Sequence, residues 1–108
     1  MKESDYVKIK VTVPKDNVDE VRNALGSTGA GKIGNYDYCS YCYPVTGKFR
    51  PTEGANPTIG TIGKLETVEE VCIESICHKD IVESVIAEMK RVHPYEEPAI
   101  DIVERFEV

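Results

Sequence analysis

The stretch VKIKVTVPKDNVDEVRNALG, residues 7–26, decides the fold class, because its hydrophobic period changes partway along. The first half alternates apolar with polar side chains, and the apolar ones are Val7, Ile9, Val11 and Val13. A period of two predicts a strand with one buried face. The second half spaces its apolar side chains along one face of a helix, at Val18, Val21, Ala24 and Leu25. Asp16 suits the N-cap of that helix, and Gly26 or Gly29 suits its end.

The same unit returns with a constant offset of 64 positions. Lys15, Asp16, Val18, Val21 and Leu25 correspond to Lys79, Asp80, Val82, Val85 and Met89. A strand over 65–77 precedes this second helix, with Val71, Ile73 and Cys77 on one face. Asp80 and Glu83 have the spacing of a capping box, and Pro94 ends the helix. A last strand follows, with Ile100, Ile102, Phe106 and Val108 as its inward face.

Between the two units, residues 35–43 (NYDYCSYCY) predict another strand. Pro44 to Gly47 offer a turn, residues 48–50 a short return, and residues 51–63 a loop. The resulting order is βαββαβ. It predicts an α+β, ferredoxin-like sandwich over residues 1–108, an antiparallel sheet with two helices on one face.

The other face of such a sheet is uncovered and carries part of a tyrosine series, Tyr36, Tyr38, Tyr41 and Tyr43. An exposed face of this kind usually finds a partner. Closed rotational symmetry covers it without open-ended growth, so we expect a homo-oligomer, specifically a trimer.

Composition excludes two classes of partner. The chain has 108 residues and a net charge of -6, with no cluster of Lys or Arg, which argues against nucleic acid and anionic membranes. No apolar run approaches the ~20 residues of a membrane span, and residues 1–10 lack a secretory signal. We therefore expect a cytoplasmic protein whose four cysteines are reduced.

Those cysteines, at 39, 42, 72 and 77, invite a zinc interpretation. Zinc ribbons hold each cysteine pair in a tight turn. Here both pairs fall in predicted strands, where odd spacings send the thiols to opposite faces. We expect no metal site at these thiols.

The glycine-rich segment GAGKIGN, residues 29–35, matches the dinucleotide pattern GxGxxG in letters only. That pattern works between a strand and a helix, whereas these glycines follow a helix and precede a strand. Residues 26–32 also resemble a P-loop, but Ile33 stands where a magnesium-binding Ser or Thr belongs. Glycine amides beside Lys32 could still hold an anion, and the alternative is a helix cap with a flexible crossover.

The segment HPYEEPAIDI, residues 93–102, has two interpretations. With a strand starting at Tyr95, Glu97 could approach His93, which makes half a metal site or an acid–base pair without a nucleophile. In the structural interpretation, Pro94 ends the helix, Tyr95 packs, and the glutamates are solvated at a strand entry.

Together with TEGANPTIG (52–60) and GAGKIGN, this segment resembles the small domain inserted in Nif-three-like dinuclear-metal proteins, the GTP cyclohydrolase type 2 homologs. The resemblance covers nearly the whole chain and implies a fold similar to CutA and PII proteins, which assemble as trimers. The family's two-metal site lies in a flanking domain, which His78 and His93 alone cannot rebuild. Hydrolase activity is therefore not implied for this chain.

We expect a non-catalytic, oligomeric module that binds a small anion, a nucleotide, a divalent metal ion or a protein partner; the sequence specifies no cofactor. One alternative is a structural subunit that docks on a separate dinuclear-metal protein. Another is a hydrolase using His93 and a carboxylate. A ligand site is expected where the glycine-rich crossover meets the 52–60 loop, at a subunit boundary. Its candidate residues are Gly29, Gly31, Lys32, Gly34, Asn35, Glu53, Asn56 and His93.

Overall fold

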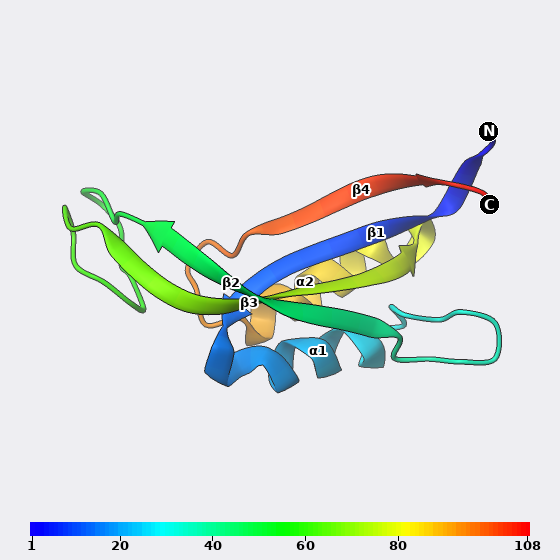
Figure 1. Ribbon diagram of the computed structural model, residues 1–108, viewed down its shortest axis with the longest axis horizontal. Helices are drawn as coiled ribbons and strands as arrows, with labels where there is room; N and C mark the ends of the chain where they lie inside the picture. The colour runs from blue at the N-terminus through cyan, green and yellow to red at the C-terminus, as the bar shows by residue number, and fades with distance from the viewer.

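A computed structural model describes all residues, Met1–Val108. The strands are β1 (Glu3–Pro14), β2 (Ser40–Phe49), β3 (Glu66–His78) and β4 (Ile100–Phe106), and the helices are α1 (Val18–Ser27) and α2 (Val82–Val92). They form one antiparallel sheet in the order β2-β3-β1-β4 with both helices on one face (Figure 1). The predicted βαββαβ sandwich is confirmed. Neither helix combines the length and apolarity that crossing a membrane requires.

The core lies between the two central strands and the helices. The alternating residues of β1 are buried as predicted, at Val7, Ile9, Val11 and Val13. They pack with Ile73 and Cys77 of β3 and with the apolar stripes of the helices, Val21, Leu25, Val85 and Met89. Each fully buried aliphatic side chain stabilises the fold by about 1.5–3 kcal/mol, so this layer holds the sandwich together.

The predicted helix caps are wrong in detail. A short 3₁₀ turn precedes each helix (Lys15–Asn17 and Lys79–Ile81), so the helical rotation begins earlier than expected. Asp16 makes no capping hydrogen bond. In the second unit the cap is His78, whose Nδ1 accepts a hydrogen bond from the Asp80 N–H at 3.1 Å. The helix end is as predicted for Gly29, which has a φ of 105° in a Schellman turn.

The predicted turn at Pro44–Gly47 is also wrong, because β2 runs unbroken through it. The whole strand pairs with β3, from Ser40 opposite Ser75 to Phe49 opposite Glu66. A proline fits here because β2 is an edge strand, where a missing N–H leaves no ladder bond unmade. Residues 35–39, expected in the strand, belong to the crossover that precedes it.

The inward face expected for the last strand is not buried. Ile102 is 41% exposed and Phe106 is 52% exposed, while Val108 lies beyond the strand and is fully exposed. The physical reason is position, because β4 forms the other edge of the sheet. Only Ile100, at the start of β4, packs against the core.

Candidate functional site

The two segments expected to form one site lie far apart within a chain. The 29–35 crossover enters β2 and the 52–60 loop leaves it, at opposite ends of a molecule 45 Å long (Figure 1). Ten residues of extended strand separate them, and at ~3.3 Å per residue these span about 33 Å. The prediction that these segments meet is therefore wrong for a single chain.

Gly31 in the crossover allows two backbone segments to pack closely. The Gly31 N–H donates to the Ile76 carbonyl at 2.7 Å, and its own carbonyl accepts from the Cys39 N–H at 2.9 Å. A Cβ at Gly31 would lie 2.5 Å from the Cys39 oxygen, and its φ of 82° also favours glycine. Lys32, Gly34 and Asn35 project into solvent beside it.

The 52–60 loop instead contacts the HPYEEP segment. The Asn56 N–H donates to Glu96 Oε1 at 3.1 Å, and the Thr58 hydroxyl donates to the Pro94 carbonyl at 2.5 Å. Glu53 is exposed and makes no such contact. Two of the three segments that carry the resemblance are thus in contact, at the end of the molecule opposite the glycines.

His93 is a structural residue in this geometry. It is 7% exposed, and both ring nitrogens are engaged. Nδ1 accepts from the Tyr95 N–H at 3.1 Å, so Nε2 carries the proton and donates to the Thr12 carbonyl at 2.8 Å. No ring nitrogen remains for a metal or a proton transfer. The expected strand start at Tyr95 is wrong, because β4 begins at Ile100.

A cleft of about 480 Å³ opens beside this segment, between the far end of the β2–β3 pair and residues 95–99. Its lining includes Thr12, Phe49, Arg50, Glu70, Tyr95 and Ala99. A volume of this size suits a small ligand. The expected 52–60 loop supplies part of its lining, through Thr52, Ala55, Pro57, Thr58 and Ile59, but none of the individual residues expected for the site lines it.

Glu70 is the residue in this cleft that sequence reasoning missed. It is only 8% exposed and makes no hydrogen bond or ion pair within the chain. Its carboxylate lies over Gly47, where an added Cβ would come within 1.6 Å of Oε1. Gly47 lies diagonal to Glu70, two positions along β2 from its direct partner Val45, and this relation became visible only once the two strands were in register.

The Tyr95 hydroxyl beside it is also unpaired. It is buried and has no hydrogen-bond partner. Burial raises the pKa of Tyr95, and the neighbouring Glu70 carboxylate raises that pKa further, although no well-formed hydrogen bond joins them. The Tyr95 ring packs against Phe49, with centroids 6.1 Å apart. The cleft therefore combines an unpaired carboxylate, an unpaired phenol and an aromatic wall.

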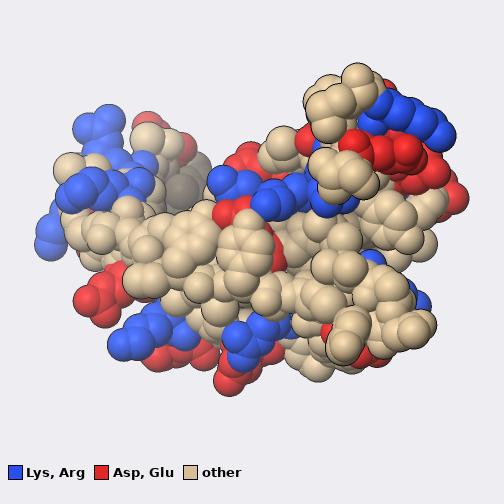
Figure 2. All heavy atoms as spheres, turned by 45° about the vertical axis from the view of Figure 1, so that its right-hand side comes forward, with Lys and Arg blue, Asp and Glu red and all other residues tan.

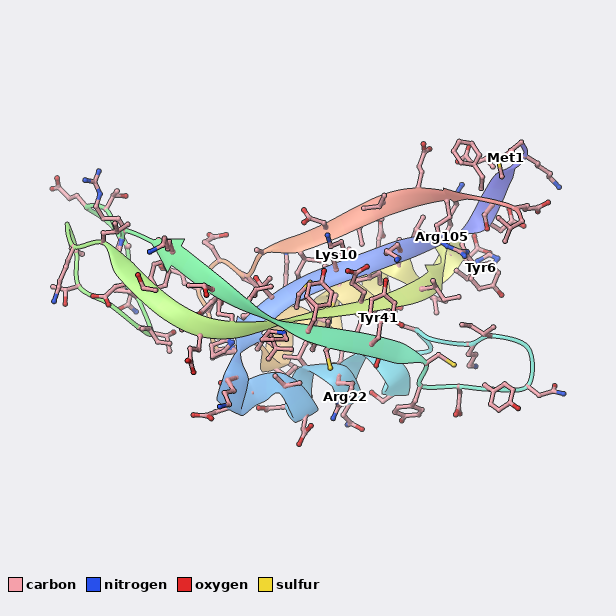
Figure 3. All side chains as sticks on the ribbon, viewed as in Figure 1. Met1, Tyr6, Lys10, Arg22, Tyr41 and Arg105 are labelled. Carbon is pink, nitrogen blue, oxygen red and sulfur yellow. The ribbon has the colours of Figure 1, made fainter.

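A second polar group lies further along the open face of the sheet. The Glu74 carboxylate, also 8% exposed, accepts from Tyr43 at 2.5 Å, from Tyr41 at 2.8 Å and from Lys8 at 3.0 Å. The Tyr43 hydroxyl, then Lys8 and Tyr41, lower the pKa of Glu74 to about 2. Figure 3 shows Tyr41 and Lys10 on this face, which the helices leave open. We call these four residues, Lys8, Tyr41, Tyr43 and Glu74, the open-face network.

The cysteines lie on different sides of the sheet. Cys77 is in the core, whereas Cys72 is on the open face, so the predicted separation of this pair is confirmed. Cys42 faces α1, where Arg22 Nη1 lies 3.7 Å from its sulfur. Cys39 precedes β2, so the expectation that both pairs lie in strands is wrong for that residue. No three His, Cys, Asp or Glu side chains gather closely enough to hold a metal ion.

Comparison with known proteins relates the chain to one group by sequence. No protein-family model matches it. The chain is 52% identical over 95 residues to the GTP cyclohydrolase 1 type 2 homolog of Halalkalibacterium halodurans, and 46% identical over 95 residues to that of Bacillus subtilis. Each match covers 88% of the chain and 26% of the relative. The chain thus spans about a quarter of the length of these relatives.

Solved structures give the same relation and add the fold. A Bacillus cereus protein related to NIF3 superimposes with a TM-score of 0.81 at 43% identity, over 96% of this chain and 26% of that one. The CutA protein of Xylella fastidiosa superimposes with a TM-score of 0.69 at 20% identity, over 97% of this chain and 86% of that one. The second likeness shows the fold alone. By sequence, the chain is similar to about a quarter of the length of the GTP cyclohydrolase 1 type 2 homologs and of a protein related to NIF3, and its fold is similar to that of CutA.

Proposed function

We propose that the chain is a non-catalytic, oligomeric binding module whose copies meet through the open face of the sheet. The observation that supports this most is the open-face network. It places a nearly buried, fully paired carboxylate at the centre of a surface that no other part of the chain covers. A surface with this organisation is suited to being covered by a second copy.

Pairing within the chain lowers the cost of covering this face. A buried charge destabilises an interface when it loses water without gaining a partner. Glu74 and Lys8 already pair with each other, so contact with a second copy removes little further solvation from them. Tyr41 and Tyr43 are 54% and 37% exposed, and tyrosine is enriched at protein interfaces.

The surrounding surface fits the same proposal. In Figure 2, uncharged atoms form a broad band across the molecule, and Lys, Arg, Asp and Glu of both signs border it. Interfaces usually carry few charged residues at their centre, and on this face the charged Lys8 and Glu74 are already paired with each other within the chain. The edge strands β2 and β4 also present unpaired backbone groups, which closed assemblies protect. Three copies around one axis is the arrangement we propose.

Size-exclusion chromatography with light scattering tests the assembly. We expect a mass near three times the 12.0 kDa chain at tens of micromolar protein. Val103→Glu places a charge on the open face of β4, where Val103 is 45% exposed opposite Lys8, and should reduce the mass to one chain. Ile62→Glu is the matched control, because Ile62 is 52% exposed in the loop after β2. A wild-type monomer at this concentration contradicts the proposal.

The expected site between the crossover and the 52–60 loop requires the assembly. A crossover of one copy would have to reach the loop of another, which is the subunit boundary proposed for it. Lys32→Ala and Asn56→Ala test this, since both side chains are exposed and neither change should alter stability by more than ~0.5 kcal/mol. Loss of stabilisation by an anion, nucleotide or divalent ion in these variants supports the site. An unchanged response places binding elsewhere.

A second candidate is a subunit that docks on a dinuclear-metal protein. The favouring observation is that the two chain ends lie side by side, where the Glu107 N–H donates to the Lys2 carbonyl at 2.8 Å (Figure 1). A domain with adjacent ends can be inserted in another without distorting either, and the curated relatives are about four times as long. Light scattering on a mixture with a purified relative that lacks the matching quarter would reveal a complex, and two separate peaks would exclude this candidate.

A further inference from the structure

We propose that the Glu70 cleft binds a small molecule through a protonated amine or guanidinium group of that molecule. This inference rests on the proposed binding function and names the class of ligand. It assigns the site to Glu70 and Tyr95, at the end of the molecule opposite the glycine crossover.

The positive charge of the proposed ligand follows from Glu70. Glu70 lies in the cleft, is 8% exposed and accepts no well-formed hydrogen bond within the chain, and its neighbour there, the Tyr95 hydroxyl, carries no charge. A largely buried carboxylate without a charged partner is destabilising, and a bound cation relieves that cost. Lys48 and Arg50 also line the cleft, but both are exposed, so solvent and salt screen their charges. The buried carboxylate therefore dominates, and it selects a cation rather than a phosphate.

The surroundings of Glu70 distinguish an organic cation from a metal ion. A divalent cation such as Ca²⁺ takes six or more oxygen ligands, and no cluster of three ligating side chains exists here. An ammonium group needs fewer fixed partners. Glu70 supplies one charged acceptor, and the unpaired Tyr95 hydroxyl supplies an acceptor and a donor. The aromatic pair of Phe49 and Tyr95 adds a wall that favours an organic cation.

The size of the cleft sets the scale of the ligand. About 480 Å³ accommodates a small amine with a short carbon chain. Pro57 and Ala99 provide apolar lining for that chain, and the carboxylates of Glu96 and Glu97 stand at the rim. Glu96 and Glu97 are exposed like Lys48 and Arg50, so solvent and salt screen them too, and Glu70 remains the deciding charge.

The test is a titration followed by ¹⁵N–¹H chemical shifts of the full chain, with butylammonium chloride and putrescine dihydrochloride as probes. Butanol at equal concentration controls for the carbon chain, and potassium chloride controls for ionic strength. We expect saturable shifts at the amides of Glu70 and Tyr95 with both amines and none with the controls. Absence of saturation by ~100 mM, which corresponds to binding weaker than about −1.4 kcal/mol, overturns the proposal.

Two variants of neighbouring residues distinguish binding at Glu70 from the effect of the chain's overall negative charge. Glu70→Gln keeps the shape and removes the charge, and it should weaken putrescine binding by about tenfold or more. Glu69→Gln is the matched control, because Glu69 is exposed on the opposite face of the same strand, and its affinity should equal that of the wild type. Equal affinity in all three proteins overturns the assignment to Glu70.

The stability of ligand-free Glu70→Gln gives an independent readout. Removal of an unpaired buried charge should raise the melting temperature, whereas loss of a structural interaction would lower it and contradict the proposal. A Lys or Arg of a second copy is the rival occupant of the cleft. In that case Glu70→Gln would lower the assembly mass and no amine would saturate, which overturns the small-molecule site and leaves the proposed oligomer intact.

Discussion

Glu70 and Glu74 lie on the same face of β3, four residues apart along the strand, and each is 8% exposed. Glu74 accepts three hydrogen bonds, one of them from a lysine, while Glu70 accepts none. The two residues are equally buried, but hydrogen bonds stabilise the charge of Glu74 and none stabilises the charge of Glu70. One carboxylate completes the surface around it, and the other leaves a charge open to a ligand.

The difference comes from the residues opposite each glutamate on the neighbouring strands. Glu74 faces Tyr41 on β2, and Lys8 reaches it from β1. Glu70 faces Val45 on β2 and the end of β1 at Pro14, neither of which has a side-chain donor. Cross-strand neighbours therefore decide what a strand residue does, and burial alone does not.

The largest effect should come from removing the paired carboxylate. Glu74→Ala leaves Lys8 and two tyrosine hydroxyls without their shared acceptor, and these groups are exposed enough to be hydrated. We expect a loss of about 2 kcal/mol in the free energy of unfolding. Urea denaturation at one fixed protein concentration measures it. Glu69→Ala is the control and should stay within ~0.5 kcal/mol of the wild type, and an equal loss in both would remove the distinction.

The pH dependence of stability sharpens the same contrast. The pKa of Glu74 falls from 4.5 to about 2 on folding, so its charged form stabilises the fold fully above pH 4.5. That contribution is lost as the pH falls from 4.5 towards 2. The stability difference between wild type and Glu74→Gln should therefore shrink over this window and vanish near its lower end. A difference that stays constant down to pH 2 contradicts the network.

A smaller effect is expected from one donor of the network. Tyr43→Phe removes the hydroxyl that contributes most to the lowered pKa of Glu74, and leaves the ring in place. We expect a smaller destabilisation than for Glu74→Ala, because one hydrogen bond is lost and its partner carboxylate keeps two other donors. The pKa of Glu74, followed by the side-chain carboxyl resonance in an NMR titration, should rise in this variant. An unchanged pKa would show that Lys8 and Tyr41 suffice.

The smallest effect should come from a variant that gives Glu70 a hydrogen-bond donor like those of Glu74. Val45 stands opposite Glu70 as Tyr41 stands opposite Glu74, so Val45→Tyr offers Glu70 the donor that it lacks. We expect a gain of about 0.5 kcal/mol, as for one cross-strand pair, together with weaker putrescine binding. Denaturation and the shift titration measure the two effects. A variant that binds putrescine as tightly as the wild type would show that the new phenol leaves Glu70 free.

Hydrophobic period predicted the central elements of the fold. β1, β3 and both helices have one buried face each, and burial on one face imposes a period that a single segment reveals. The edge strands were predicted less well. β2 tolerates Pro44 and β4 exposes Ile102, because an edge strand is constrained on one side only.

The candidate site was also predicted only in part. Resemblance and loop composition singled out the 52–60 loop and the HPYEEP segment, and the two do meet, through Asn56 with Glu96. Within one chain the glycine crossover lies apart from them, because a ten-residue strand holds the two loops at opposite ends, and their meeting across a subunit boundary stays a prediction. Glu70 was missed for a related reason, since it is one of several glutamates in the run LETVEEVCIESIC.

The sequence by itself determined the order of the elements, the buried face of each central element and the presence of an uncovered sheet face. These properties are encoded within short segments, where side chains alternate or repeat along one strand or helix. Only the tertiary structure decided which glutamate is paired and which groups engage the two ring nitrogens of His93, because those outcomes depend on strand register and on contacts between residues up to 81 positions apart in the sequence. That register places Val45 opposite Glu70, where Glu74 has a tyrosine, and so leaves the Glu70 carboxylate unpaired.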